Sequence, residues 1–506
     1  MSLAIYLVVT LGFAASAWAA RDRASLSMVI GVGGLAAAVI AALSINPGEA
    51  LVMGGGGLGT SAYGRIFLVL GSVVGLALAV AGIAGQTRRD FPAVTLATLG
   101  LGALTLGLTD LRAAVVAGTA GGACAALLTV SRGGDRAGAT VGIRDLRAVV
   151  VAGAMAIAAT AWVGRDLNQL DAQPVVFGLA YLALALAVAI RFAAIPFHLW
   201  AARLTDVVPE LALPIVTVLG AAPFAIVGLD WANASIGPLL VDLGTERGIV
   251  LAIAVASIVL SALAALVQDD LEHVVGYSIV GDAGVALLAL VALDPDALAP
   301  ARTWILVLVV ARSAFAAWAG GVRVAFGTGR IEELRGWVVR SPLLAVAFVL
   351  IMIAGLGFPG LAAFEARRAL VDLAIDGPLA ALVLLGTLAP LAYYGRLLSV
   401  GLDRPAGSHG PGQWRPRSTR LDLTALPDWW RQTWEANRAF SSALAAVLLG
   451  LLAVATAAGA VGGPYAGAGA ASGGAVPIAS SVPSASGDLF QPFPSEAPSF
   501  LPVPTQ

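Results

Sequence analysis

The sequence predicts an all-α polytopic membrane protein with about fourteen transmembrane helices. Of 506 residues, 59% are hydrophobic and only 12% are charged, about half the ~25% that is usual in soluble domains. The mean hydropathy is +0.91. So many apolar residues cannot all be buried in the core of one soluble domain, because a soluble fold needs a polar surface. Fourteen apolar runs alternate with polar loops, without the period-two pattern of barrel strands.

The same composition excludes a soluble enzyme, a disordered protein and a nucleic-acid binder. The net charge is −1 and all 29 basic side chains are Arg, so there is no bulk basic field for a polyanion. The single Cys124 excludes an internal disulfide framework and a cysteine metal cluster. Three scattered His residues do not suggest a zinc site. We expect no cofactor, no metal and no directly bound NAD, because the sequence lacks a glycine-rich fingerprint and a cysteine set for iron–sulfur clusters.

The expected helices each approach the ~20 apolar residues that cross ~30 Å of hydrocarbon. They lie at 3–20, 26–45, 65–85, 91–108, 112–130, 147–164, 175–197, 211–229, 248–267, 273–293, 302–325, 342–375, 378–400 and 440–462. We expect the first to be a retained helix rather than a signal peptide. Arg21 and Arg23 follow this run and no basic residue precedes it, the reverse of a secretory signal.

Arginine placement predicts the orientation. With the N-terminus outside, 19 of the 29 Arg fall in inner loops and five in outer ones. This positive-inside bias places both termini on the outer side of a bacterial-type plasma membrane.

The chain divides into six expected parts. They are a three-helix segment (1–90), two inverted five-helix repeats (91–230 and 248–400), an inner-side amphipathic loop (401–438), a last transmembrane helix (439–462) and a disordered tail (463–506). The Arg- and Trp-containing loop either lies on the inner leaflet or is solvated beside partner subunits.

Two expected spans are each broken by a proline near charged residues. The seventh contains Arg191, Pro196 and His198, and the twelfth contains Pro359, Glu365, Arg367 and Arg368. A proline in mid-membrane frees a carbonyl, which is tolerated only where protein or a water-filled cavity satisfies it. The breaks are five spans apart, so the two helices cross in opposite directions. Paired broken helices of this kind indicate a transport path between inverted repeats.

Four motifs occur in a characteristic order: Ile195–Trp200, Gln268–Ser278, Gly357–Phe364 and Tyr393–Arg396. With them the chain resembles the antiporter-like membrane subunits of respiratory complex I, nearest to subunit N of NADH-quinone oxidoreductase. Mrp-type cation/proton antiporters and membrane-bound hydrogenases are related branches. The resemblance covers about residues 60–400 and implies proton translocation driven by redox chemistry in other subunits.

The expected proton carriers of that family are replaced in this sequence. Pumping members have a Glu on the fifth helix and Lys on the seventh, eighth and twelfth helices. The Glu position falls near Thr119 or Ala120, and the Lys positions fall on Arg191, near Pro223 and on Arg367. Arg, with a pKa near ~13.8, stays charged and cannot exchange protons usefully. We therefore expect Arg191 and Arg367 to act as fixed charges.

Two of the remaining titratable side chains each have two possible roles. His198 can relay protons or hydrogen-bond the broken backbone. Asp282, deep in the tenth span, either carries protons or pairs with an intramembrane Arg, and Arg312 is the expected partner.

Two further sets of carboxylates have simpler expectations. Glu365 is expected to form an i,i+3 ion pair with Arg368 rather than to carry protons, because pairing lowers the pKa of the carboxylate. Asp206 and Glu210 are expected to be merely solvated.

Three functions remain open. The first is a proton-translocating membrane subunit of a complex I-type NADH-quinone oxidoreductase, and the second is a degenerate, non-pumping scaffold of that complex. The third is an Mrp-like cation/proton antiporter subunit, which the missing carriers disfavour most. The expected partners are other membrane subunits of a respiratory complex and the lipid bilayer.

Overall fold

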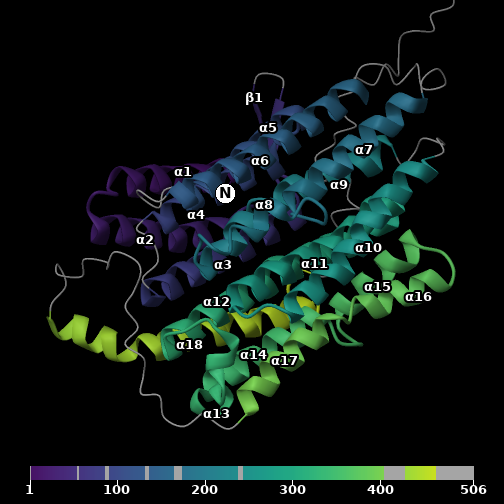
Figure 1. Ribbon diagram of the computed structural model, residues 1–506. Coiled ribbons are helices and arrows are strands. Elements are labelled where there is room, and N and C mark those ends of the chain that lie inside the picture. The colour runs from purple at the N-terminus through teal and green to yellow at the C-terminus, as the bar shows by residue number, and fades with distance from the viewer. Residues whose placement is uncertain are drawn as a thin grey trace, which may run out of the picture.

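The computed structural model describes residues 2–53, 56–85, 90–130, 136–163, 174–236, 243–403 and 428–462. In this part the protein is a bundle of helices that lie side by side with roughly parallel axes (Figure 1). Nine helical stretches in the described part are long and apolar enough to cross a membrane, and four shorter apolar helices accompany them. The predicted class, a mostly helical multi-pass membrane protein, is confirmed. The number fourteen and the inverted repeats stay predictions.

The first part of the chain contains seven helices and one hairpin. They are α1 (Leu3–Ala19), α2 (Ala24–Leu43), β1 (Ala50–Met53), β2 (Gly56–Gly59), α3 (Ala62–Gly85), α4 (Phe91–Gly107), α5 (Leu111–Val130), α6 (Arg136–Val163) and α7 (Pro174–Arg191). The antiparallel hairpin was not predicted, because its glycine-rich residues show no alternating apolar pattern. The backbone N–H of Gly57 donates to Thr109 Oγ1 at 2.7 Å, which joins the hairpin to the α4–α5 connection.

The seventh span is broken as predicted, but the helix ends earlier than expected. α7 ends at Arg191, ahead of Pro196, whose ring and missing N–H are incompatible with a continuing helix. The short α8 (Leu199–Ala202) follows. The span expected at 211–229 is also interrupted: it consists of η2 (Glu210–Ala212), the π-helical η3 (Ile215–Leu219) and α9 (Ala222–Ser235).

The second part of the chain repeats this pattern of long and broken helices. It contains α10 (Gly244–Leu266), α11 (Leu271–Ala292), η4 (Pro295–Ala297), α12 (Leu298–Phe326), η5 (Ile331–Leu334), α13 (Trp337–Arg340), α14 (Pro342–Leu356), α15 (Ala362–Ala374), α16 (Pro378–Gly386), α17 (Pro390–Leu402) and α18 (Asp428–Ala457). The break at Pro359 separates α14 from α15, as predicted. Gly357 and Gly360 there have φ of +54° and +91°, which glycine adopts without strain.

One expected boundary in this part is wrong. The span expected at 378–400 matches a candidate membrane span, Pro378–Leu402, within which Pro390 begins a second helix after residues 387–389. The last helix begins at Asp428 rather than at residue 440, so the end of the expected amphipathic loop is helical. Residues 404–427 of that loop and the expected tail at 463–506 lie outside the described residues.

α12 is the central helix of the bundle. Its apolar stretch is completely buried, and it packs against α3, α11, α14, α15 and α18. Figure 1 shows α18, in yellow, lying along this part of the bundle. The central position of α12 determines where buried charges can meet.

Candidate functional site

α12 carries three arginines, and each of them pairs with one or two carboxylates from other elements. Arg302, Arg312 and Arg323 are ten and eleven residues apart. At 1.5 Å rise per residue, their Cα atoms are spaced by roughly 15 Å along the helix. The three ion pairs therefore mark one end, the middle and the other end of the bundle.

The middle pair is the one that the sequence predicted. Arg312 Nε donates to Asp282 Oδ2 at 2.5 Å and Arg312 Nη2 donates to Asp282 Oδ1 at 2.7 Å. The remaining Nη1 donates to the hydroxyls of Tyr394 at 2.9 Å and Tyr393 at 3.4 Å. The Arg312 side chain is fully buried and that of Asp282 is 8% exposed. Bidentate geometry and added hydroxyl acceptors are what a buried charge pair requires.

The pairs at the two ends of α12 were missed. Arg302 Nη2 donates to Asp230 Oδ1 at 2.7 Å. Arg323 bridges Glu210, at 2.6 Å, and Glu272. The expectation that Glu210 is merely solvated is wrong, because this residue is only 4% exposed.

Asp206 differs from Glu210, because it is half exposed. It lies 3.2 Å from Nε2 of His273.

At the first break, Arg191 points into the protein. It is 1% exposed, and its Nη2 donates to the carbonyl of Gly220 at 2.5 Å. Its Nε has no hydrogen-bond partner among the described residues. A Cβ at Gly122 of α5 would overlap the guanidinium, so the small residue there makes room for it.

Asp145 of α6 supplies a negative charge near Arg191, and sequence reasoning did not single it out. It is fully buried, it interacts electrostatically with Arg191, and neither carboxylate oxygen has a hydrogen-bond partner in the described part of the chain. The expected span at 147–164 begins after this residue, so residue 145 is expected in a loop. A buried carboxylate with free lone pairs is a proton-accepting group.

At the second break, Arg367 binds the broken backbone. It is 1% exposed. Its Nη2 donates to the carbonyl of Gly357 at 3.3 Å and its Nη1 to that of Thr387 at 3.4 Å. The guanidinium also lies over the rings of Trp304 and Phe364, at 5.9 and 5.6 Å. A positive charge thus satisfies carbonyls that the interrupted helices leave free.

The predicted ion pair between Glu365 and Arg368 is wrong. Both side chains are exposed, and Arg368 contacts Asp372 at 3.4 Å instead. The i,i+4 spacing reaches the same helical face as i,i+3. Glu365 lies in the first turn of α15, where the helix dipole favours a carboxylate without an Arg partner.

His198 is partly exposed and lines a small cavity with His273, Thr217 and Tyr277. Its Nδ1 is buried and has no hydrogen-bond partner within the described ranges. The imidazole also interacts with the backbone of Pro196. Two other side chains bind the broken backbone: the N–H of Ile195 donates to Ser257 Oγ at 2.9 Å, and Trp200 Nε1 donates to the Ile190 carbonyl at 3.1 Å. In the described part no three His, Cys, Asp or Glu side chains are grouped to bind a metal ion.

The family described as NADH:quinone oxidoreductase/Mrp antiporter, transmembrane, matches residues 156–391. NADH-quinone oxidoreductase subunit N 1 of Acidiphilium cryptum is 29% identical over 244 residues, 45% of this chain and 49% of that protein. Subunit N of Acidithiobacillus ferrooxidans is 28% identical over 258 residues, 49% and 52% of the two chains. The alignments thus span about half the length of these curated relatives.

The fold is also that of solved membrane complexes. A chain of the Mrp complex from Dietzia sp. superimposes with a TM-score of 0.71 at 17% identity, covering 94% of this chain and 99% of the other. A chain of respiratory complex I from Thermus thermophilus with bound NADH gives 0.68 at 21% identity, covering 93% and 99%. These likenesses describe the fold of the whole bundle.

Proposed function

We propose that this chain, which belongs to the NADH:quinone oxidoreductase/Mrp antiporter family over residues 156–391, is a membrane subunit of a complex I-type NADH-quinone oxidoreductase. Its role there is proton translocation, driven by redox chemistry in other subunits. The similarity to subunit N supports this assembly. The other membrane subunits and the bilayer are its partners, and both of its termini lie on the outer side.

The observation that carries the proposal is the placement of buried charge at the helix breaks. Arg191 and Arg367 lie inside the bundle, each beside an interrupted helix, and Asp282 with Arg312 lies between elements of the same core. Charges in the apolar interior of a membrane protein are costly, and they are retained where they line an ion path. This pattern fits the predicted pair of inverted repeats.

The carboxylates are the proton carriers in this proposal, and the arginines are fixed charges. A proton that reaches Asp145 neutralises the charge that faces Arg191. A proton that reaches Asp282 neutralises this carboxylate and weakens its ion pair with Arg312. Arg312 still donates hydrogen bonds to the hydroxyls of Tyr393 and Tyr394. Permanent cations beside exchangeable carboxylates favour release of the proton again, because a neighbouring positive charge favours the ionised acid.

Two alternatives have support in particular residues. Pro223, Thr119 and Ala120 occupy positions where the resemblance implies carriers, which favours a non-pumping scaffold. The whole-chain likeness to an Mrp complex subunit favours an antiporter subunit. The subunits that co-purify with a tagged copy of this chain separate the antiporter from the other two: oxidoreductase subunits are expected.

Pumping is tested in the purified complex reconstituted into vesicles. The paired variant Asp282→Asn with Arg312→Gln removes both central charges together. We expect NADH oxidation to continue while the number of protons moved per electron falls. The exposed Asp296→Asn serves as the control. An unchanged ratio in the paired variant would leave the scaffold role as the better description.

A further inference from the structure

We propose that Asp230 is a proton-exchange site at the outer end of the bundle, where Arg302 holds it at a small hydrated cavity. This inference rests on the proposed function and adds to it the place where protons meet the outer solution. Neither residue belongs to the charges at the helix breaks. The argument starts from the cavity and proceeds to the ion pair.

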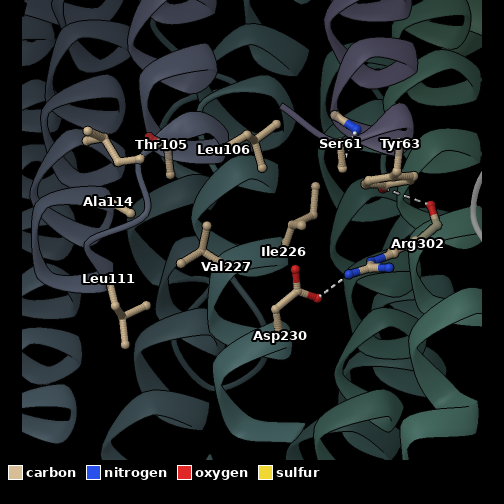
Figure 2. Close-up of a pocket in the computed structure, with 12 residues that line it drawn as sticks. Ser61, Tyr63, Thr105, Leu106, Leu111, Ala114, Ile226, Val227, Asp230 and Arg302 are labelled. Atoms are coloured by element: carbon tan, nitrogen blue, oxygen red, sulfur yellow. Dashed lines mark hydrogen bonds and ion pairs between the residues drawn. The ribbon is translucent and has the colours of Figure 1, made fainter. Parts of the chain in front are cut away.

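The cavity lies where several elements end on the same side of the bundle. Its lining includes Ser61 and Tyr63 near the start of α3, Leu108 after α4, Leu111 at the start of α5 and Val227 in α9. Figure 2 shows Asp230 and Arg302 facing each other, with Tyr63 and Val227 among the other labelled lining residues. Arginine placement puts this end outside. The cavity has a volume of about 40 Å³, which leaves room for water, since one molecule needs ~10–15 Å³.

The ion pair uses only part of the Arg302 guanidinium. Arg302 Nη2 binds Asp230 Oδ1 at 2.7 Å. Arg302 Nε and Nη1 are buried and have no hydrogen-bond partner within the part of the chain that the structure describes. The lining is mostly apolar, but Ser61, Asp230 and Arg302 also belong to it. These polar side chains give water in the cavity hydrogen-bond partners, so we infer a hydrated inlet rather than an empty packing defect.

The carboxylate is the more accessible partner of the pair. The Asp230 side chain is 21% exposed, whereas that of Arg302 is 4% exposed. A proton from solution therefore reaches the acid without passing the buried guanidinium. This order suits a site that exchanges protons with water.

Tyr63 holds Arg302 in place independently of Asp230. Its hydroxyl donates to the Arg302 carbonyl at 3.0 Å, and its ring lies 5.5 Å from the guanidinium. Arg302 from α12 and Tyr63 from α3 are the charged and titratable groups that face the acid. Asp110, next to the lining residue Leu111, accepts from the backbone N–H groups of Arg112 and Ala113.

The exchange step moves one proton and no electrons. A hydronium ion in the cavity transfers its proton to a carboxylate oxygen of Asp230, and a water molecule remains. The Arg302 Nη2–Asp230 Oδ1 ion pair is lost, while the contacts of Arg302 with Tyr63 remain. Two residues further along α12, Trp304 Nε1 donates to the backbone carbonyl of Asp282 at 2.9 Å, so the outer site and the central pair share one rigid helix.

Water access is tested first, in the assembled complex in sealed membranes. Val227→Cys is made in a Cys124→Ala background and treated with a membrane-impermeant, positively charged thiol reagent from either side. We expect labelling from the outer side and none at the core position Val285→Cys. Absence of labelling at Val227→Cys from the outer side would overturn the inlet.

Proton movement is tested with two matched paired variants. Asp230→Asn with Arg302→Gln is compared with Asp282→Asn with Arg312→Gln, and Asp296→Asn is the control. We expect both pairs to lose the same share of protons per electron, with no further loss when they are combined, because they act in series. If only the central pair lowers the ratio, the outer site is refuted and the proposed function stands. If neither pair lowers it, the proposed function itself fails.

Discussion

Asp282 receives two hydrogen bonds from Arg312, at 2.5 and 2.7 Å, and this pair lies on the same helix as the ion pairs of Arg302 and Arg323. The carboxylates come from α9, α11 and η2. α12 therefore joins charged groups of both halves of the chain. A change in the charge of one carboxylate therefore acts on a helix that also binds the other carboxylates.

The first prediction concerns the loss of stability when Asp282 is neutralised and Arg312 remains charged. Asp282→Asn alone leaves the guanidinium of Arg312 buried without its countercharge, which costs about 3–5 kcal/mol. The paired variant with Arg312→Gln removes the stranded charge and should regain most of that loss. Thermal denaturation of the solubilised complex measures both. Equal midpoints for the single and paired variants would contradict a tight ion pair.

The central pair could be predicted from sequence, whereas the end pairs could not. Asp282 and Arg312 are opposite charges deep inside two apolar runs, and each needs a partner. Asp230 and Glu210, which belong to the end pairs, lie next to the ends of the apolar run at 211–229, where a carboxylate is as compatible with water as with burial; the same holds for Asp145 before the run at 147–164. The α6 helix begins at Arg136, eleven residues before the expected span, so the apolar pattern alone could not place Asp145 in the core.

The other differences between the predicted and the observed structure also concern features that depend on tertiary packing. Both proline breaks were predicted because proline cannot continue a helix, but the residue at which each helix ends depends on packing. The partner of Arg368 depended on rotamer choice between i−3 and i+4 neighbours, which spacing does not decide. The pairing of β1 with β2 is supported by a contact with Thr109, which lies far away in sequence.

The second prediction concerns the fixed charge at the first break. Arg191→Ala removes the charge facing Asp145 and the bond to the Gly220 carbonyl, so we expect less of this chain in the purified complex. Arg21→Ala, an exposed residue over Trp18, is the matched control and should change stability by less than ~0.5 kcal/mol. Quantitative gel analysis of the complex measures assembly. Normal assembly with a selective loss of pumped protons would show that Arg191 is itself part of the relay.

The third prediction tests the space around the same guanidinium. Gly122→Ala puts a methyl group into atoms of Arg191 and should destabilise by about 1–3 kcal/mol, as overpacking does. Gly33→Ala, in the middle of α2 with nothing within 4 Å of the added carbon, should stabilise by about 0.4–1 kcal/mol. Thermal midpoints of the two variants should therefore move in opposite directions. A neutral Gly122→Ala would mean that Arg191 readily adopts another position.

The fourth prediction separates the two tyrosines that bind Arg312. Tyr394→Phe removes an acceptor at 2.9 Å from Nη1, whereas Tyr393→Phe removes one at 3.4 Å. A hydrogen bond to a charged group contributes about 1.5–3 kcal/mol, and it weakens with distance, so Tyr394→Phe should lower the thermal midpoint more. If Asp282 exchanges protons, these hydroxyls are what Arg312 keeps while the acid is neutral, so Tyr394→Phe should also slow proton movement per turnover. If Tyr393→Phe were the more damaging variant, Tyr393 and not Tyr394 would be the main hydroxyl partner of Arg312.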